Sequence, residues 1–175
     1  LPLSMLTDSH CHLGSHKFPE DELGPLIDRA RDAGVTRMMT LATNLEDIPR
    51  NLSIAEKFPE VYACVGIHPC DVHETPDDYL EALQEFATHH RVAAIGETGL
   101  DYFHPAPTGW TEEGYHQRQR NFLRQHFALA VETGQNVVIH TRDRKGDASF
   151  SDALAIYKPF ANDLQAVFHC FPGPY

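Results

Sequence analysis

The sequence contains no apolar run of the roughly 18 residues that a membrane-spanning helix requires, and its first residues lack the charged flank and long apolar stretch of a signal peptide. Its four cysteines form no CxxC pair, so reduced thiols are favoured over a disulfide framework. We therefore expect a cytoplasmic location and no membrane contact. With 42% hydrophobic and 22% charged residues, the composition is typical of a soluble globular protein.

Positive charge is scarce. Lysine and arginine number 14 against 25 acidic residues, which gives a formal net charge of -11. This balance excludes a protein that holds nucleic acid by a broad cationic surface, because such a chain repels phosphates at long range. It does not exclude a local site in which bound metal ions supply the positive charge. Histidine, by contrast, is unusually frequent, with 12 residues.

Three familiar motifs are absent from the sequence. No GxGxxG motif opens a helix, although Gly96 and Gly99 flank Glu97, so the chain carries no dinucleotide-binding fingerprint. There is no phosphate-binding P-loop. No GxSxG elbow is present either, which argues against a serine hydrolase.

Short apolar runs alternate with segments of helical spacing. Six buried strands are predicted, at Ser4 to Ser9, Arg37 to Ala42, Val61 to Ile67, Val92 to Gly96, Asn136 to Ile139 and Gln165 to Phe168. Helices are expected around Leu23 to Ala30, Tyr79 to Phe86 and Phe122 to Ala130. This alternation is typical of a parallel sheet, and it leaves two closures open: a doubly wound sheet or a (β/α)₈ barrel.

His10 and His12 stand at the end of the first predicted strand. Because residues two apart in an extended segment share a face, one metal ion can bind both imidazoles. The alternative is a pair of solvated histidines at a strand end. The intervening Cys11 is interpreted as a spacer that points into the core.

Other predicted strands end in similar residues. The relevant motifs are Gly66-Ile67-His68-Pro69, Gly96-Glu97-Thr98-Gly99, His140-Thr141-Arg142-Asp143 and His169-Cys170. A single histidine in such a place is more often a hydrogen-bonded cap. However, the carboxyl ends of parallel strands open on one side, so these groups are expected to converge.

Imidazoles and a carboxylate without thiolate suit Zn²⁺, Mn²⁺, Fe²⁺ or Mg²⁺, and the carboxylate can bridge two ions. Two such ions activate water and bind phosphate-ester oxygens, so hydrolysis is predicted. The remaining histidines are predicted to be solvated: His16, His73, His89, His90, His104, His116 and His126.

With these residues assembled, the chain resembles the TatD family of metal-dependent deoxyribonucleases, a branch of the amidohydrolase-like TIM barrels. The matching motifs, in family order, are Asp8-Ser9-His10-Cys11-His12-Leu13, Gly66-Ile67-His68-Pro69, Ile95-Gly96-Glu97-Thr98-Gly99-Leu100-Asp101-Tyr102, Val138-Ile139-His140-Thr141-Arg142 and Phe168-His169-Cys170-Phe171. The GETGLDY segment together with the ordered set makes the resemblance specific.

The resemblance implies an α/β fold, a (β/α)₈ TIM barrel of the metal-dependent hydrolase type. It implies two divalent metal ions (Mg, Mn or Zn), one held by His10 and His12 and the other by His140 and His169. Glu97 would bridge the ions and be catalytic, while His68 and Arg142 would face the substrate phosphate. The implied activity is hydrolysis of DNA phosphodiester bonds, as a 3′ to 5′ exonuclease, by a metal-activated water. No protein partner is inferred.

The chain departs from the family pattern at its C-terminal side, because the family continues for roughly 80 further residues and carries a metal-binding Asp there. Only about the first six βα units are present, so residues 1–175 are expected to form the N-terminal two thirds of a single catalytic barrel domain. Two alternatives remain. One is a related amidohydrolase-type enzyme acting on an amide, lactone or other phosphoester, and the other is a non-catalytic truncated remnant that binds metal or a partner chain.

Overall fold

The computed structural model describes residues 5–170, in which strands and helices alternate as predicted. The strands are β1 (Leu6–Cys11), β2 (Val35–Leu41), β3 (Val61–Val65), β4 (Val92–Tyr102), β5 (Asn136–Asp143) and β6 (Ala166–Phe168). The helices are α1 (Glu20–Asp32), α2 (Ile48–Lys57), α3 (Tyr79–Ala87), α4 (Glu112–Thr133) and α5 (Ala148–Tyr157), followed by a 3₁₀ turn over Lys158–Phe160.

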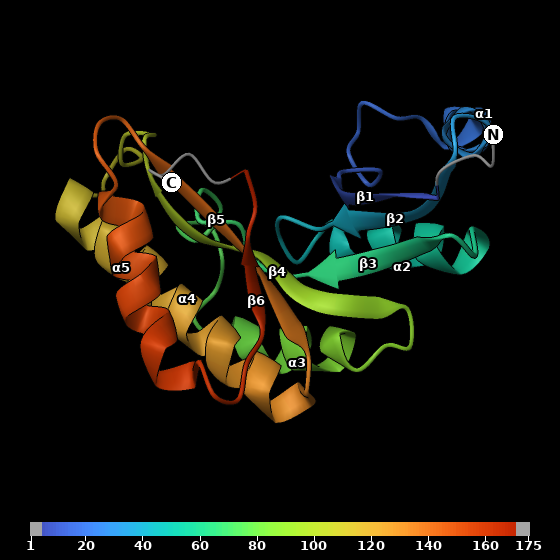
Figure 1. Cartoon of the computed structure of the whole chain (residues 1–175). Helices are drawn as coiled ribbons and strands as arrows, with labels where there is room; N and C mark the ends of the chain where they lie inside the picture. The colour runs from blue at the N-terminus through green and yellow to red at the C-terminus, as the bar shows by residue number, and fades with distance from the viewer. Residues whose placement is uncertain (1–4, 171–175) are drawn as a thin grey trace.

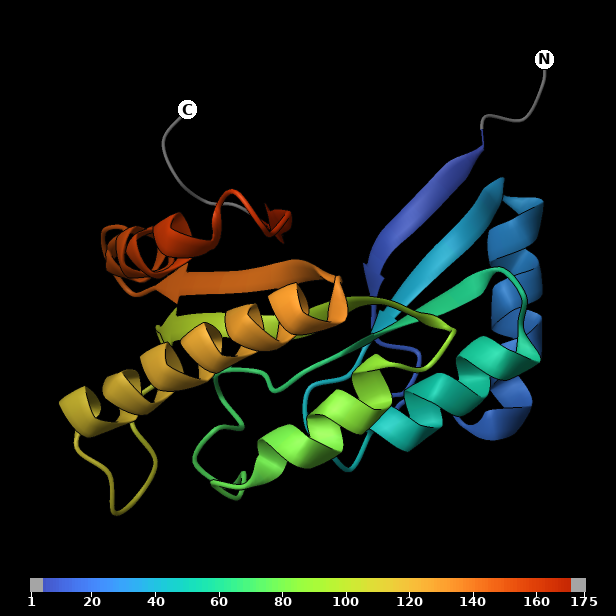
Figure 2. The same cartoon turned by 90° about the horizontal axis from the view of Figure 1, so that it is seen from below.

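The six strands form one parallel sheet in the order β1-β2-β3-β4-β5-β6. A doubly wound sheet requires the strand order to reverse at a switch point, whereas sequential order is the arrangement of a barrel. Figures 1 and 2 show the helices along the outside of a strongly curved sheet, with β1 and β6 at its two ends. The expectation of a (β/α)₈-type fold with six units is therefore confirmed.

Alternating residues of the strands pack on opposite faces of the sheet. Ile95, Val137 and Ile139 belong to the large core between the sheet and the helices, whereas Ala94 and Val138 belong to a small cluster on the inner face. Strands covered on both faces carry nearly continuous apolar runs. This is why Val137, Val138 and Ile139 are all buried although they are consecutive.

Two strands extend well beyond their predicted ends. β4 was predicted to end at Gly96 but continues to Tyr102, and β5 continues from Ile139 to Asp143. The ladder between them shifts register between Ile95 and Thr98 and then continues to its end. The shift is accommodated by Gly96, whose φ of 136° is accessible mainly to glycine.

The other boundaries differ by smaller amounts. β1 runs to Cys11 rather than Ser9, and the predicted start at Ser4 lies outside the described residues. α4 begins at Glu112 because the Thr111 hydroxyl accepts a hydrogen bond from the Gly114 N–H. It ends at Gly134, whose left-handed φ of 67° terminates the helix. No helix within residues 5–170 is both long enough and apolar enough to cross a membrane.

Candidate metal centre

The carboxylate of Glu97 lies at the centre of a cluster of histidines. Glu97 is in β4 and only 3% exposed. Five imidazoles approach it: His10 Nε2 (3.3 Å) and His12 Nε2 (3.5 Å) face its Oε2, while His68 Nε2 (3.8 Å), His140 Nδ1 (3.0 Å) and His169 Nε2 (2.6 Å) face its Oε1. The two carboxylate oxygens therefore face two separate sets of rings. We refer to Glu97 and these five residues as the His/Glu cluster.

The parallel sheet explains this convergence. His10 and His140 lie in β1 and β5, and His12, His68 and His169 follow β1, β3 and β6 at their carboxyl ends. These ends meet on one side of the sheet, as the sequence predicted. The five side chains keep 13% to 39% of their surface exposed, so solvent ions can reach the cluster.

The rings also contact one another. His10 stacks on His169 with ring centroids 3.9 Å apart, and His169 Nε2 lies 3.3 Å from His140 Nδ1. His10 Nδ1 is buried and has no hydrogen-bond partner among the described residues. Convergent imidazole nitrogens beside one carboxylate are the donor set of Zn²⁺ and related cations, so the cluster fits metal ions.

The structure contains two groups in which three ligand atoms all lie within 4.8 Å of one another. One group is His10, Glu97 and His169, and the other is His68, Glu97 and His140. The family resemblance implies a different grouping, with His10 and His12 on one ion and His140 and His169 on the other. The stacking of His10 on His169 brings the ends of β1 and β6 together, which the strand order alone did not reveal. The roles of the individual histidines as ligands stay a prediction.

Hydrogen bonds outside the cluster orient two of the rings, those of His12 and His140. His12 Nδ1 lies 3.0 Å from the carbonyl oxygen of Leu41 and must donate to it, which leaves Nε2 with a lone pair towards Glu97. His140 Nε2 lies 3.0 Å from Asp101 Oδ2 and donates to that carboxylate. Such outer contacts are typical of metal-binding histidines, because they fix which nitrogen is free.

The carboxylate and the imidazoles of the cluster shift one another's pKa values. Burial opposes ionisation of Glu97, but hydrogen bonds from His10, His140 and His169 outweigh it and hold the pKa of this carboxyl well below its usual range. Burial likewise opposes protonation of His140, yet Asp101 and Glu97 raise its pKa to about 9. Glu97 is therefore an anion at neutral pH, as a metal ligand must be.

Burial has the opposite effect on His68. Burial and the neighbouring His140 lower the pKa of His68 to about 4. The backbone N–H of Cys70 donates to His68 Nδ1 at 3.1 Å, so the neutral ring carries its proton on Nε2, the nitrogen that faces Glu97. His68 is thus a neutral hydrogen-bond donor that points into the cluster.

Arg142 is the predicted site residue that lies apart from the cluster. Its side chain is exposed, and its guanidinium carbon lies 4.0 Å from the ring centroid of Phe103, a cation–π contact. Phe103 is 38% exposed. The pair forms an exposed aromatic and cationic surface where β4 and β5 end, because Arg142 is near the end of β5 and Phe103 directly follows β4.

Asp101 was quoted in a motif but given no role by the sequence analysis. It is 1% exposed, and its carboxylate contacts both His140 and His104. Its spacing of four from Glu97 in an extended segment is the signal that could have identified it, because even spacing places two side chains on one face. The prediction that His126 is solvated was wrong, since this residue is fully buried within the core packing of α4.

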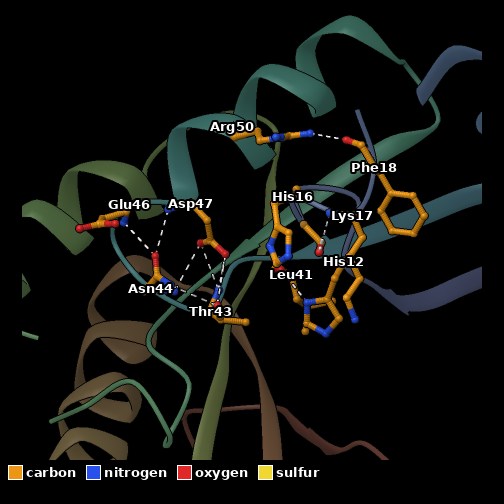
Figure 3. A pocket seen from close by; sticks show the side chains of 12 residues that line it. His12, His16, Lys17, Phe18, Leu41, Thr43, Asn44, Glu46, Asp47 and Arg50 are labelled. Atoms are coloured by element: carbon orange, nitrogen blue, oxygen red, sulfur yellow. Dashed lines mark hydrogen bonds between the residues drawn. The ribbon is translucent and has the colours of Figure 1, made fainter. Parts of the chain in front are cut away.

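A pocket of about 800 Å³ adjoins the cluster and shares His12 with it. Figure 3 shows His12, His16 and Lys17, from the segment after β1, on one side and Thr43 and Asp47, from the segment after β2, on the other. The volume lies within the range of about 300 to 1,000 Å³ that is usual for ligand sites.

Two acidic residues line this pocket, and one of them, Asp47, is already engaged in hydrogen bonds, whereas Glu46 is exposed. The Asp47 carboxylate accepts hydrogen bonds from the backbone N–H groups of Thr43 and Asn44 and from the Thr43 hydroxyl. Burial raises its pKa. Lys17, in contrast, is exposed, and no ion pair of its side chain is found among residues 5–170. The pocket therefore holds a cationic side chain that can contact an anion, although Glu46 and Asp47 line it as well.

Comparison with known proteins finds a matching family and several similar relatives. Residues 7–175 match the family described as TatD related DNase. An uncharacterized metal-dependent hydrolase of Bacillus subtilis, YabD, is 31% identical over 170 residues, which cover 97% of this chain and 62% of that protein. A protein of Edwardsiella piscicida named 3′-5′ ssDNA/RNA exonuclease TatD is also 31% identical over 170 residues, covering 96% of this chain and 60% of its own length.

The fold agrees with a solved member of this group. The crystal structure of YjjV, a TatD homologue from Escherichia coli, superposes with a TM-score of 0.79 at 29% identity and covers 98% of this chain and 62% of that one. The chain thus spans about three fifths of the length of these relatives. Its sequence match, its curved parallel sheet and its histidines at the strand ends together establish that the chain belongs to the TatD related DNase family.

Proposed function

We propose that this protein is a metal-dependent hydrolase that cleaves DNA phosphodiester bonds and removes nucleotides from the 3′ end of single strands. The observation that carries the proposal is the convergence of five imidazoles on the buried carboxylate of Glu97. The polarity and substrate are supported by relatives from Edwardsiella piscicida and Dickeya dadantii that are named 3′-5′ ssDNA/RNA exonucleases. Residues 1–175 would supply the N-terminal two thirds of one catalytic barrel domain.

Two divalent cations (Mg, Mn or Zn) would be held on the two sides of Glu97. His10 and His12 face Oε2, and His140 and His169 face Oε1, so the carboxylate is positioned to bridge. Bound cations would supply positive charge for the phosphate oxygens and acidify a water molecule. In a chain of net charge -11, this is the charge that an anionic substrate needs.

His68 is proposed to contact the substrate phosphate. Its Nε2 carries the proton, because Nδ1 accepts from the Cys70 N–H. The low pKa of about 4 keeps the ring neutral at physiological pH, so it donates one hydrogen bond without adding a competing positive charge. A neutral donor suits a place beside metal cations, where a charged ring would be repelled.

Arg142 is proposed to contact the nucleic acid outside the cluster. Its contact with the Phe103 ring holds the guanidinium at the rim, where it can bind a neighbouring phosphate. The exposed Phe103 ring offers a surface on which a base can stack, an interaction worth about 1 to 3 kcal/mol per base. The pocket lined by His12 and Lys17 is a second path for the strand.

A direct test is release of nucleotides from a 5′-labelled single-stranded oligonucleotide with Mg²⁺, Mn²⁺ or Zn²⁺. The wild-type chain should shorten it from the 3′ end, and EDTA should stop the reaction. Glu97→Gln should reduce the rate by at least about 100-fold, because the bridging charge is lost. Glu85→Gln is the matched control, since Glu85 is exposed on α3 and should leave the rate unchanged.

Metal content distinguishes the alternatives. Two ions per wild-type chain and fewer in Glu97→Gln would support the two-cation site. Full activity in Glu97→Gln would overturn the proposal. Turnover of an amide or lactone without cleavage of DNA would favour the other amidohydrolase-type activities, and the absence of any turnover would favour the non-catalytic remnant.

A further inference from the structure

A second group of ligand-type side chains lies beside the His/Glu cluster. Cys70 follows His68 by two residues, Asp101 is near the end of β4, and His104 follows that strand. Cys70 Sγ lies 3.6 Å from His104 Nδ1, and His104 Nδ1 lies 3.0 Å from Asp101 Oδ1. The three ligand atoms all lie within 4.8 Å of one another.

These separations are close to those of a tetrahedral zinc site. Bonds of about 2.3 Å to sulfur and about 2.0 to 2.1 Å to nitrogen and oxygen place sulfur about 3.6 Å from nitrogen, and nitrogen about 3.3 Å from oxygen. The observed distances of 3.6 and 3.0 Å require little adjustment. A cation would take the place of the proton that now lies between His104 Nδ1 and Asp101 Oδ1.

The ligands are held in place by their backbones. The carbonyl of Cys70 accepts hydrogen bonds from the Tyr115 hydroxyl at 3.2 Å and from His73 Nδ1 at 2.9 Å. Asp101 Oδ1 accepts the backbone N–H groups of Phe103 at 3.0 Å and His104 at 2.9 Å. Two of the three ligands are therefore preorganised, which lowers the cost of ordering them around an ion.

Cys70 distinguishes this group from the His/Glu cluster. The cluster offers imidazole nitrogen and carboxylate oxygen, and the nearby Cys11 thiol instead donates to the carbonyl of Met39 at 3.2 Å. A thiolate selects borderline or soft cations such as Zn²⁺, Co²⁺ and Cd²⁺ over Mg²⁺ or Mn²⁺. His104 is 48% exposed, which leaves an entry path and a coordination position for water.

We propose that Cys70, Asp101 and His104 form an additional site for a zinc-type divalent cation, separate from the two ions of the His/Glu cluster. Asp101 links the two sites, because its Oδ1 faces this group and its Oδ2 accepts from His140. The His/Glu cluster would bind hard or borderline cations, and the additional site would bind thiophilic ones. The proposal does not depend on nuclease activity.

The test is titration of the 175-residue chain with Cd²⁺, followed by the ultraviolet charge-transfer band of a cadmium thiolate. In the wild type the absorbance of this band should saturate at one equivalent of Cd²⁺ per chain, and Cys70→Ser should abolish the band. Cys170→Ser is the matched control, because Cys170 is exposed beside His169 and should keep the band. His104→Ala should retain the thiol but weaken Cd²⁺ binding at least about 10-fold.

The readout is a sulfur-to-metal band, so it is independent of catalysis and of the ions at Glu97. Thermal melting of each variant shows whether it is folded, and His104→Ala decides the question if Cys70→Ser does not fold. A wild-type chain without the band at excess Cd²⁺ would overturn the proposal. So would a band that persists in Cys70→Ser or that disappears only in Cys170→Ser.

Discussion

At the scale of single residues, the glycines of the GETG segment determine where the site histidines lie. Gly99 is the ladder partner of His140, and its φ is 153°. A Cβ atom built on Gly99 would lie 1.9 Å from the carbonyl oxygen of His140. The close approach of β4 to β5, which brings Glu97 to His140, is therefore possible only without a side chain at position 99.

Gly99→Ala should consequently destabilise the fold and weaken metal binding. Separating β4 from β5 to admit a methyl group should cost about 1 to 3 kcal/mol, the usual penalty of overpacking. Denaturant unfolding and calorimetric titration with Mn²⁺ measure both effects. Gly24→Ala is the control, because nothing lies within 4 Å of that Cβ position in α1 and alanine there should stabilise the helix by about 0.5 to 1 kcal/mol. An unchanged unfolding midpoint for Gly99→Ala would show that the strands tolerate separation.

The histidines themselves were largely identifiable from sequence, whereas the contacts between their rings were not. His10, His12, His68, His140 and His169 each follow or end an apolar run, and parallel strands bring such ends together. The stacking of His10 on His169 depends on how far the sheet curls, which is a property of the whole sheet. Asp101 was given no role because it lies beyond the predicted end of the strand at Gly96, and in the structure its carboxylate also has a structural role, accepting hydrogen bonds from the N–H groups of Phe103 and His104.

At the scale of elements, His126 connects α4 to the segment that carries His68. Its Nδ1 donates to the carbonyl of Phe122 at 2.7 Å, and its Nε2 accepts from the Ile67 N–H at 3.1 Å. The ring therefore satisfies a backbone donor directly before His68. The sequence placed His126 on a solvated helix face because its helical position relative to Phe122 and Phe127 did not reveal how tightly α4 packs against the sheet.

This contact predicts a pH-dependent stability. Burial lowers the pKa of His126 to about 4, against about 6.5 in the unfolded chain. Between these values the unfolded chain binds a proton that the folded chain does not, so the free energy of unfolding falls as the pH falls through this window. From pH 8 to pH 5 the loss from this residue should be about 2 kcal/mol.

Urea unfolding of the wild type and of His126→Gln at both pH values, in EDTA, isolates this contribution. The variant should be less stable at pH 8 but should lose about 2 kcal/mol less on acidification. His90→Gln is the control, because His90 is exposed and its removal should leave the wild-type pH dependence unchanged. Identical pH dependence in the wild type and His126→Gln would contradict the assignment.

Element types were the most predictable part of the fold, and element ends were the least. All six strands were found from β-branched and apolar runs, because strands covered on both faces need such residues. The extensions of β4 and β5 contain Glu97, Asp101, His140 and Asp143, which periodicity interprets as loop. Glu97, Asp101 and His140 are in strands because their side chains point to the site rather than to the core, whereas the Asp143 carboxylate accepts hydrogen bonds from the Ser149 N–H and hydroxyl in α5.

At the scale of the whole molecule, a net charge of -11 opposes the binding of a polyanion. Two cationic side chains without an ion pair among residues 5–170 lie near the carboxyl ends of the strands. Lys17 lines the pocket that shares His12 with the His/Glu cluster, and Arg142 is near the end of β5. We therefore expect few phosphate contacts and a shallow dependence of DNA affinity on salt, because each contact with a single strand adds only about 0.7 to the logarithmic slope.

Lys17→Ala tests whether the strand passes through this pocket. Removing one phosphate contact should raise KM for a single-stranded oligonucleotide about fivefold at low salt, equally for all sequences, and should reduce the salt slope of kcat/KM by about 1. Lys158→Ala removes the same charge from an exposed position after α5, away from the site-bearing strand ends, and should leave both quantities unchanged. Equal losses in the two variants would indicate a general charge effect, and an unchanged slope in Lys17→Ala would place the strand elsewhere, on the side of Arg142 and Phe103.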